Sequence, residues 1–189
     1  ANTETLLSTK LIKDENSINF TTAIQSQSER MATIVNELLS ISSMESGDYP
    51  ISLDKLNIKN IVDSAIKELN PMTESSNIKL VNKISDITHI IGDESAIKII
   101  ISNYITNAIK HSPDDEIIEI DNEKIDKDFC RIKVIDNGIG IAKKYRERVF
   151  ERFFRVDKGR SKKIGGTGLG LSISKNLALM MGYSVGVES

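Results

Sequence analysis

The stretch from Asn103 to Lys110 constrains the fold of this chain more than any other part of its 189 residues. Asn103, Asn107 and Lys110 stand at positions i, i+4 and i+7, so in a helix their side chains project from one face. Two amides and one ammonium on one face suit a magnesium–polyphosphate, because amide oxygens are hard ligands and lysine neutralises phosphate. Taken alone, the pattern is more typical of a surface helix with two solvated asparagines. The same helix carries an apolar stripe that we expect to face a core. The members of this stripe are Ile97, Ile101, Tyr104, Ile105 and Ala108.

A second candidate segment is Asp136-Asn137-Gly138-Ile139-Gly140, which follows a predicted strand at 131–135. The carboxylate of Asp136 accepts hydrogen bonds and cannot donate them, so it suits the exocyclic amine of adenine. The two glycines allow a ligand to come close to the backbone. On its own, the segment is more typical of a strand-ending turn, because Asn-Gly is among the commonest turn dipeptides.

A third segment, Gly165-Gly166-Thr167-Gly168-Leu169-Gly170-Leu171, opens the last predicted helix. Backbone amides at a helix N-terminus, free of side chains, form an anion site that suits phosphates. The spacing differs from the dinucleotide-binding fingerprint, and no Gly-Lys-Ser/Thr sequence closes the segment as it does in a Walker loop.

The stretch 143–163 between the two glycine clusters is strongly basic. Ten Lys and Arg residues against three Asp and Glu residues leave a charge of +7, in a chain whose net charge is −2. Such a run is usually a solvated face or a nucleic-acid patch. Here Val149, Phe150, Phe153 and Phe154 supply an apolar anchor near its start. A basic loop anchored by phenylalanines and flanked by glycines favours a lid over a triphosphate.

Helices and strands mix along the chain without a strict βαβ rhythm. Strands are predicted at 51–56, 77–84, 88–91, 116–120, 129–135 and 183–187, and helices at 59–75, 94–112 and 168–181. Asp93 is expected to cap the central helix, which ends at Ser112-Pro113. This order favours an α+β fold, a two-layer sandwich with helices on one face of a mixed sheet.

The first 47 residues predict a helical appendage, which the breaker Ser46-Gly47-Asp48-Tyr49-Pro50 separates from the rest. Apolar residues recur there every seven positions, which indicates a seam for packing against another helix. The seam consists of Ile24, Met31 and Leu38, with Ile34 and Ile41 repeating the offset and Val35 and Leu39 beside them. With Thr5–Ser8 as the tail of an earlier helix, this predicts a helical hairpin, and two such hairpins make a four-helix bundle. An amphipathic helix that packs on its own domain explains the periodicity equally well.

Composition narrows the function classes. A hydrophobic content of 39% and a charged content of 28% are ordinary for a globular protein. The net charge of −2 argues against nucleic-acid binding by bulk positive charge. The single cysteine, Cys130, excludes an internal disulfide and fits a reducing compartment. No apolar run reaches the length of a membrane span, and no signal-peptide pattern is present. Because the chain opens with Ala1 and not with methionine, we expect it to be a fragment of a longer protein.

Taken together, four motifs resemble, in order and spacing, the four boxes of sensor histidine kinases. These kinases belong to the wider ATP-binding superfamily that includes DNA gyrase and the heat-shock chaperones. The motifs are Asn103…Asn107-Ala108…Lys110, Asp136-Asn137-Gly138-Ile139-Gly140, Phe150-Glu151-Arg152-Phe153-Phe154-Arg155 and Gly166-Thr167-Gly168-Leu169-Gly170-Leu171. The resemblance covers about Ile51 to the C-terminus. It implies a Bergerat-type ATP-binding fold, with 55–189 as the catalytic domain, 48–54 as a linker and 1–47 as part of the dimerisation hairpin.

The resemblance implies ATP and Mg²⁺ as ligands and gives the motif residues roles. Asn107 is the expected magnesium ligand, with Asn103 assisting, and Lys110 and Arg155 are the expected phosphate contacts; these four are the expected catalytic residues. Asp136 is the expected adenine reader. The other residues expected around the nucleotide are His111, which follows Lys110, and members of the pocket turn, the phenylalanine box and the lid hinge. These members are Gly138, Gly140, Phe150, Phe153, Gly166, Thr167, Gly168, Leu169 and Gly170.

The implied reaction is transfer of the γ-phosphoryl group of ATP to a histidine, and onward to an aspartate of a response regulator. The family's acceptor histidine is followed by Glu or Asp and, shortly after, Pro. Neither His89 nor His111 fits that pattern, so we expect the acceptor upstream of Ala1, and further sheet strands beyond Ser189. Gyrase-like hydrolases carry a glutamate base where this chain has Asn103, which favours phosphotransfer over hydrolysis. The implied setting is the cytoplasmic part of a homodimeric parent in the bacterial plasma membrane, with no nucleic-acid partner.

Three alternatives stay open. An anti-sigma-factor serine kinase belongs to the same superfamily, although the hairpin-like leader and the phenylalanine-rich box count against it. A non-catalytic module, in which the helices bind a partner and nucleotide only sets the lid, belongs to a different class of protein. A nucleic-acid binder that uses the basic run is the weakest of the three.

Overall fold

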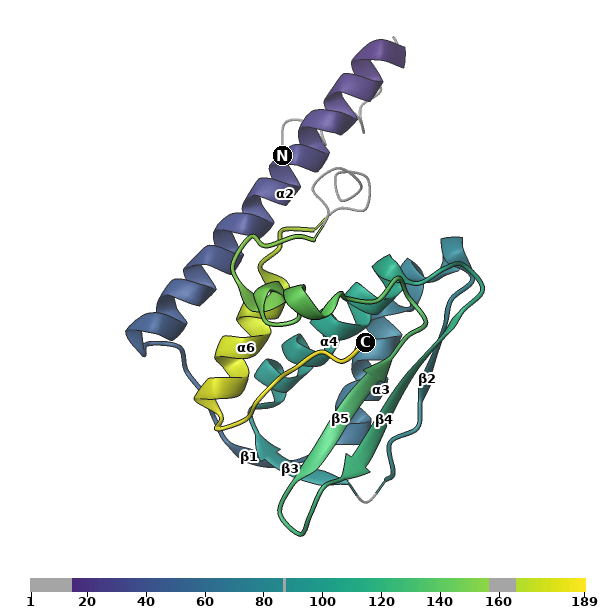
Figure 1. The fold of residues 1–189 in the computed structure, drawn as a ribbon. Helices are drawn as coiled ribbons and strands as arrows, with labels where there is room; N and C mark the ends of the chain where they lie inside the picture. The colour runs from purple at the N-terminus through teal and green to yellow at the C-terminus, as the bar shows by residue number, and fades with distance from the viewer. Residues whose placement is uncertain (1–14, 87, 157–165) are drawn as a thin grey trace.

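The computed structural model describes residues 15–86, 88–156 and 166–189. A long helix extends from an α/β unit that contains the rest of the described chain (Figure 1). The helices and strands, in chain order, are α2 (Glu15–Ser46), β1 (Asp54–Asn57), α3 (Ile58–Leu69), β2 (Lys79–Asn82), β3 (His89–Gly92), α4 (Glu94–His111), β4 (Ile117–Lys124), β5 (Cys130–Ile135) and α6 (Gly170–Met180). Short 3₁₀ turns occupy Asn70–Met72, Glu74–Ser76, Lys143–Tyr145 and Arg148–Phe150.

The described strands form two sheets, a mixed one of three strands and an antiparallel one of two. In the larger sheet β2 runs parallel to β4, pairing Lys79 with Ile117, and β4 runs antiparallel to β5, pairing Glu119 with Ile135. In the smaller one β1 and β3 are antiparallel, with Asn57 opposite His89. Helices α3 and α4 lie against the larger sheet, and α6 packs beside α4 (Figure 1). The predicted α+β, two-layer architecture is confirmed, whereas the earlier helix of the predicted hairpin, at Thr5–Ser8, lies outside the described residues.

Helix α4 begins where the sequence predicts. The Asp93 carboxylate accepts a hydrogen bond from the Ala96 backbone N–H at 2.8 Å, which is an N-cap, and another from the Ser52 N–H at 3.0 Å. These two bonds, the one from Ser52 foremost, lower the pKa of Asp93 below its ordinary value, because they stabilise the ionised form. The helix stops at His111, before Ser112-Pro113, as expected from the proline.

The core lies between α4, its neighbouring helices and the sheet. Its fully buried members include Ile58 and Val62 of α3, Ile105 of α4 and Ile118 and Ile120 of β4. Four members of the predicted α4 stripe are buried, and the fifth, Tyr104, is partly buried. Burial raises the pKa of Tyr104 to about 12, and its hydroxyl donates to the Gly186 carbonyl at 3.1 Å.

We expect Ile105→Ala to lower the free energy of unfolding by about 3 kcal/mol, because it deletes buried methyl groups and leaves a cavity in a site that is 0% exposed. Chemical unfolding in urea measures the change. Ile91→Ala is the matched control, since the Ile91 side chain on β3 is exposed and its truncation should change stability little. Equal losses in both variants would contradict this placement of the core.

Helix α2 has two apolar faces rather than one seam. Ile41 and Met44 are buried against the α/β unit, with Ile41 1% exposed, and Ile34 is partly buried on the same side. The side chains of Ile24 and Met31 are exposed, Met31 by 67%. The predicted heptad residues therefore divide between a face that packs on its own domain and a face without a partner in the described chain. The first face confirms an amphipathic helix that packs on its own domain, and packing of the second face against another helix stays a prediction.

The predicted strand at 183–187 is not present. A strand needs a ladder of backbone hydrogen bonds, whereas here the Tyr183 N–H donates back to the Ala178 carbonyl of α6 at 2.8 Å, and side-chain hydroxyls make the following bonds. The Tyr104 hydroxyl bonds to the Gly186 carbonyl, the Tyr183 hydroxyl to the Ile91 carbonyl, and the Ser189 hydroxyl accepts from the Ile141 N–H at 3.0 Å. None of the described helices is both long enough and apolar enough to cross a membrane.

Candidate functional site

The three polar residues of α4 have different surroundings. The Asn103 amide nitrogen donates to the Gly170 carbonyl at 2.9 Å and to the Ser174 hydroxyl at 3.0 Å, so it joins α4 to α6. Asn107, one turn later, is partly buried, and its side chain makes no hydrogen bond to any described residue. An uncommitted amide at a partly buried position is free to bind a ligand, whereas the amide nitrogen of Asn103 is already used.

Lys110 and Arg155 meet at Gly166. Arg155 Nη1 donates to the Gly166 carbonyl at 2.9 Å, and Lys110 Nζ lies 3.8 Å from the point that a Cβ on Gly166 would occupy. Burial lowers the pKa of Lys110, and the positive charge of Arg155 lowers it further, whereas Glu37 opposes both effects. Two cations held close together, one of them partly desolvated, favour an anion between them.

Asp136 and Gly138 form a tight turn against the end of α4. The Gly138 N–H donates to Asp136 Oδ1 at 2.8 Å, and the Ile139 N–H donates to the His111 carbonyl at 3.3 Å. A Cβ on Gly138 would lie 2.8 Å from the His111 carbonyl oxygen, so only glycine fits this approach. The turn leaves the Asp136 carboxylate exposed, beside His111 and the end of α4.

The pKa of His111 lies below its ordinary value of 6.5, mainly through partial burial and then through Lys110 and Arg155, while Asp136 opposes them. The unfolded chain therefore takes up a proton at higher pH than the folded chain. It follows that the free energy of unfolding falls as the pH drops through 6.5 towards the folded pKa. We expect His111→Gln to lose less stability than the unmodified chain between about pH 7.5 and about pH 5.5 in urea unfolding. An identical pH dependence in both proteins would contradict the shift.

The phenylalanine box and the glycine-rich segment are joined through their backbones. The Phe153 N–H donates to the Gly168 carbonyl at 2.9 Å. Gly168 has φ +75°, and a Cβ there would lie 3.1 Å from the Phe153 backbone, so a side chain is excluded on two counts. The Phe154 ring packs on Tyr145, with centroids 5.8 Å apart, whereas the Phe153 ring is 53% exposed.

The remaining predicted site residues lie around the same loops. Phe150 is partly buried in a 3₁₀ turn, Thr167 Oγ1 accepts from the Leu169 N–H at 3.2 Å, and the Leu169 side chain is fully buried. Gly170 begins α6, and Gly140 has φ +69° in the turn after Gly138. The basic lid that the sequence predicts between these loops lies, over residues 157–165, outside the described residues.

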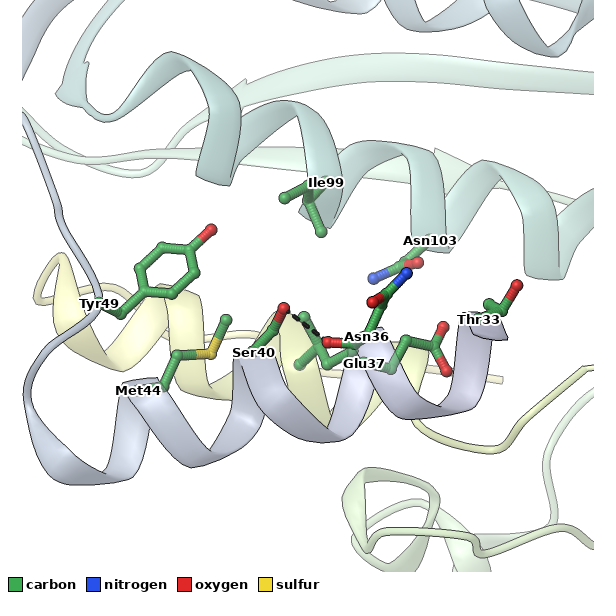
Figure 2. A pocket seen from close by; sticks show the side chains of 9 residues that line it. Thr33, Asn36, Glu37, Ser40, Met44, Tyr49, Ile99 and Asn103 are labelled. Atoms are coloured by element: carbon green, nitrogen blue, oxygen red, sulfur yellow. Dashed lines mark hydrogen bonds between the residues drawn. The ribbon is translucent and has the colours of Figure 1, made fainter. Parts of the chain in front are cut away.

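The sequence analysis missed the contribution of α2. Arg30 Nη2 donates to the same Gly166 carbonyl at 3.4 Å, and Glu45 forms an ion pair with Arg152 of the phenylalanine box. Glu37 and Asn103 line a common cavity between α2 and α4 (Figure 2). The signal was present in the spacing, because Arg30 and Glu37 are two turns apart, on the side of α2 that carries Ile34 and Ile41.

This geometry agrees with comparisons to known proteins. The model of the family described as "Histidine kinase-, DNA gyrase B-, and HSP90-like ATPase" matches residues 92–189, which contain α4, the Asp136 turn, the phenylalanine box and the glycine-rich segment. The chain belongs to this ATPase family.

Relatives of this ATPase family member include sensor histidine kinases. The sensor-like histidine kinase SenX3 of Mycolicibacterium smegmatis is 37% identical over 159 residues, which is 84% of this chain and 41% of SenX3. The sensor histidine kinase WalK of Bacillus subtilis is 35% identical over 175 residues, 90% of this chain and 28% of WalK. The chain thus spans less than half the length of these curated relatives.

Solved structures show the same ATPase fold. Full-length ShkA, crystallised in complex with AMPPNP, superposes with a TM-score of 0.79 at 25% identity, over 93% of this chain and 36% of ShkA. The histidine kinase ThkA, solved in complex with the response regulator TrrA, covers 100% of this chain and 54% of the ThkA chain with a TM-score of 0.71; its 19% identity bears on the fold alone.

Proposed function

We propose that this chain is the ATP-binding catalytic part of a sensor histidine kinase. The observation that carries the proposal is the convergence of Asn107, Lys110, Arg155 and Asp136, four residues from three separate motifs, around the end of α4. Membership of the ATPase family and the similarity to SenX3 and WalK support it. The reaction proposed for the whole protein is transfer of the γ-phosphoryl group of ATP to a histidine, for relay to an aspartate of a response regulator.

The proposed roles follow from the chemistry of each side chain. The exposed Asp136 carboxylate accepts the hydrogen bond of the adenine amine. Lys110 and Arg155 contact the phosphates, and the partly desolvated ammonium of Lys110 gains most from a nearby anion. The glycine-rich segment before α6 presents backbone amides to the phosphates, with Gly166 and Gly168 as hinge positions.

Asn107 is the proposed magnesium ligand, and its uncommitted amide supports this role. No cluster of three or more His, Cys, Asp or Glu side chains exists among the described residues, so a magnesium ion would rest on amide oxygen, phosphates and water. The ion would supply charge neutralisation for the phosphates. Asn103, which we propose as the assisting residue, holds α4 against α6 and so fixes the position of Asn107.

In the proposed reaction the bond from the γ-phosphorus to the bridging oxygen of ATP breaks, and a bond from phosphorus to an imidazole nitrogen forms. ADP leaves with the electron pair, and the proton of the imidazole is lost to solvent. Such a transfer depends mainly on positioning and on stabilisation of charge. Asn103 stands where gyrase-like hydrolases carry a glutamate base, which is consistent with transfer to a protein and not to water.

We further propose that residues 1–47 belong to a dimerisation hairpin, 48–54 to a linker and 55–189 to the catalytic domain of a membrane-anchored parent. The exposed apolar face of α2, which includes Ile24, Met31, Val35 and Leu39, supports a homodimer, because such a stripe suits a second helix. Nucleic acid is not proposed as a partner.

The decisive experiment combines binding and transfer. Calorimetric titration of the folded chain with ATP should give saturable binding that strengthens with Mg²⁺. A longer chain that includes the preceding helix should then acquire label from γ-³²P-ATP, in a form stable to alkali and labile to acid, as a phosphorus–nitrogen bond is. ATP binding without label in any extended chain would favour a nucleotide-gated interaction module, and an acid-stable label would favour a serine kinase.

A further inference from the structure

Helix α2 carries three charged side chains on the side that faces the rest of the described chain. Arg30, Glu37 and Glu45 are seven and eight residues apart, so they lie on one side of the helix. Arg30 bonds to the Gly166 carbonyl at 3.4 Å, and Glu45 forms an ion pair with Arg152. These two contacts hold α2 against the segments that flank the predicted lid, and Glu37 lies between them.

Glu37 faces a cavity of about 300 Å³ between α2, α4 and α6. Figure 2 shows Asn36, Glu37 and Ser40 along α2, with Asn103 opposite on α4. One carboxylate oxygen of Glu37, Oε2, is buried and has no hydrogen-bond donor among the described residues. A buried carboxylate oxygen without a donor is costly unless a positive charge lies near it.

Lys110 of α4 is a positive charge that interacts with Glu37. The helices α2 and α4 run in opposite directions (Figure 2), so moving from Asn103 to Lys110 along α4 corresponds to moving from Glu37 towards Arg30 along α2. Gly166 marks the Arg30 end of this stretch, because its carbonyl accepts a hydrogen bond from Arg30. Lys110 Nζ lies 3.8 Å from the point that a Cβ on Gly166 would occupy. Lys110 therefore lies opposite the part of α2 between its two contacts, Arg30 with Gly166 and Glu45 with Arg152. Consistently, Glu37 raises the pKa of Lys110 while burial and Arg155 lower it.

We propose that Glu37 is a positioning residue that competes with nucleotide phosphates for Lys110. While α2 lies along the catalytic unit, its carboxylate provides the negative charge that Lys110 would otherwise obtain from ATP. Binding of a polyphosphate has to overcome this attraction, so the position of α2 sets the nucleotide affinity. By linkage, the same free energy acts on the position of α2 when nucleotide binds. The inference rests on the proposed function, because it takes Lys110 as a phosphate contact.

The test is nucleotide affinity in Glu37→Gln, which is nearly isosteric and removes only the charge. We expect ATP to bind about fivefold more tightly to this variant, at unchanged magnesium and salt concentrations. Glu29→Gln is the matched control, since it removes the same charge from an exposed position of α2, and it should leave affinity unchanged. Adenosine, which lacks phosphates, should bind equally to all three proteins. In a Lys110→Met background, Glu37→Gln should have no effect.

A pH profile separates competition from a merely structural role. Within residues 15–86, 88–156 and 166–189, the charged and titratable groups that face Lys110 include Glu37 and Arg30 of α2, His111 of α4, Arg155 and, through His111, Asp136. Without Glu37 the pKa of Lys110 falls, so the loss of ATP affinity at alkaline pH should begin at lower pH in Glu37→Gln. If Glu37→Gln changed only the packing, the pH at which ATP affinity begins to fall would be the same as in the unmodified chain.

The outcomes are distinct. If the folded chain binds ATP and Glu37→Gln binds it with equal affinity, the inference is wrong and the proposed function stands. If both glutamate variants tighten binding equally, the effect is general charge and the inference is also wrong. If no folded variant binds ATP, the proposed function fails and this inference fails with it. Urea unfolding of each variant establishes that it is folded.

Discussion

Replacing Asn107 with alanine is expected to remove the magnesium dependence of ATP binding and to reduce phosphotransfer about a thousandfold. The reason is that Asn107 has the uncommitted, partly buried amide of α4, whereas Asn103 is bonded to α6. A magnesium ion bound to phosphates needs a protein oxygen to fix its place, and without one the triphosphate is no longer held in a reactive position. Titrations with ATP in the presence of Mg²⁺ or of a chelator measure the first effect, and labelling of an extended chain measures the second.

The control for Asn107→Ala is Asn19→Ala, which removes an amide from an exposed position of α2. It should leave both binding and transfer unchanged. Because Asn107 makes no hydrogen bond within the described chain, its loss should change the urea midpoint little. Unchanged magnesium dependence in a folded Asn107→Ala protein would show that another residue holds the ion.

The second large effect is expected for Asp136→Asn, which should weaken ATP binding by about 10- to 100-fold. The substitution is mild for the fold, because an asparagine Oδ1 can accept from the Gly138 N–H as the aspartate does. For the ligand it is severe, since it removes the charge of the carboxylate and replaces one of its acceptor oxygens with a donor facing the donor amine of adenine. Calorimetry measures the loss.

The selectivity between adenine and hypoxanthine nucleotides tests directly whether Asp136 contacts the base. Inosine triphosphate carries a carbonyl where adenine carries its amine, so an amide donor at position 136 should favour it. We expect the ratio of ATP affinity to inosine triphosphate affinity to fall in Asp136→Asn. Asp126→Asn is the matched control, because Asp126 also accepts backbone N–H bonds in a turn, between β4 and β5. An unchanged ratio would exclude Asp136 as the residue that reads the base.

Local patterns in the sequence were sufficient to predict the centre of this fold. Helix α4 was predicted from three signals that act within one segment. These are the N-cap at Asp93, the proline that follows its end at Ser112-Pro113, and the apolar stripe between them. The grouping of Asn107, Lys110 and Asp136 was predictable for a different reason. It is implied by the resemblance of four motifs, each of which was ambiguous alone, to the four boxes of sensor histidine kinases.

What the sequence did not predict depends on contacts between distant segments. The periodicity of α2 could not show that Ile41 packs on the α/β unit while Met31 is exposed, because both residues repeat at heptad spacing. The alternation at 183–187 resembles a strand, but strand formation needs a partner to supply the ladder. Glu37 and Arg30 were missed because their spacing places them on the side of α2 that carries Ile34 and Ile41 but does not show which residues lie opposite.

The hydrogen bonds from Asn103 to α6 limit how this chain can be re-engineered. A glutamate at position 103 would supply the general base that the related hydrolases use. Exchanging this residue alone is therefore the simplest design. The carboxylate would then face the Gly170 carbonyl, at the place where an amide nitrogen now donates at 2.9 Å, and the hydroxyl of Ser174, which already donates to that carbonyl at 3.0 Å. The glutamate carboxylate and the Gly170 carbonyl would both be hydrogen-bond acceptors, with no donor between them. We expect α4 and α6 to move apart as a result. Conversion to a hydrolase therefore requires the start of α6 to be redesigned together with position 103.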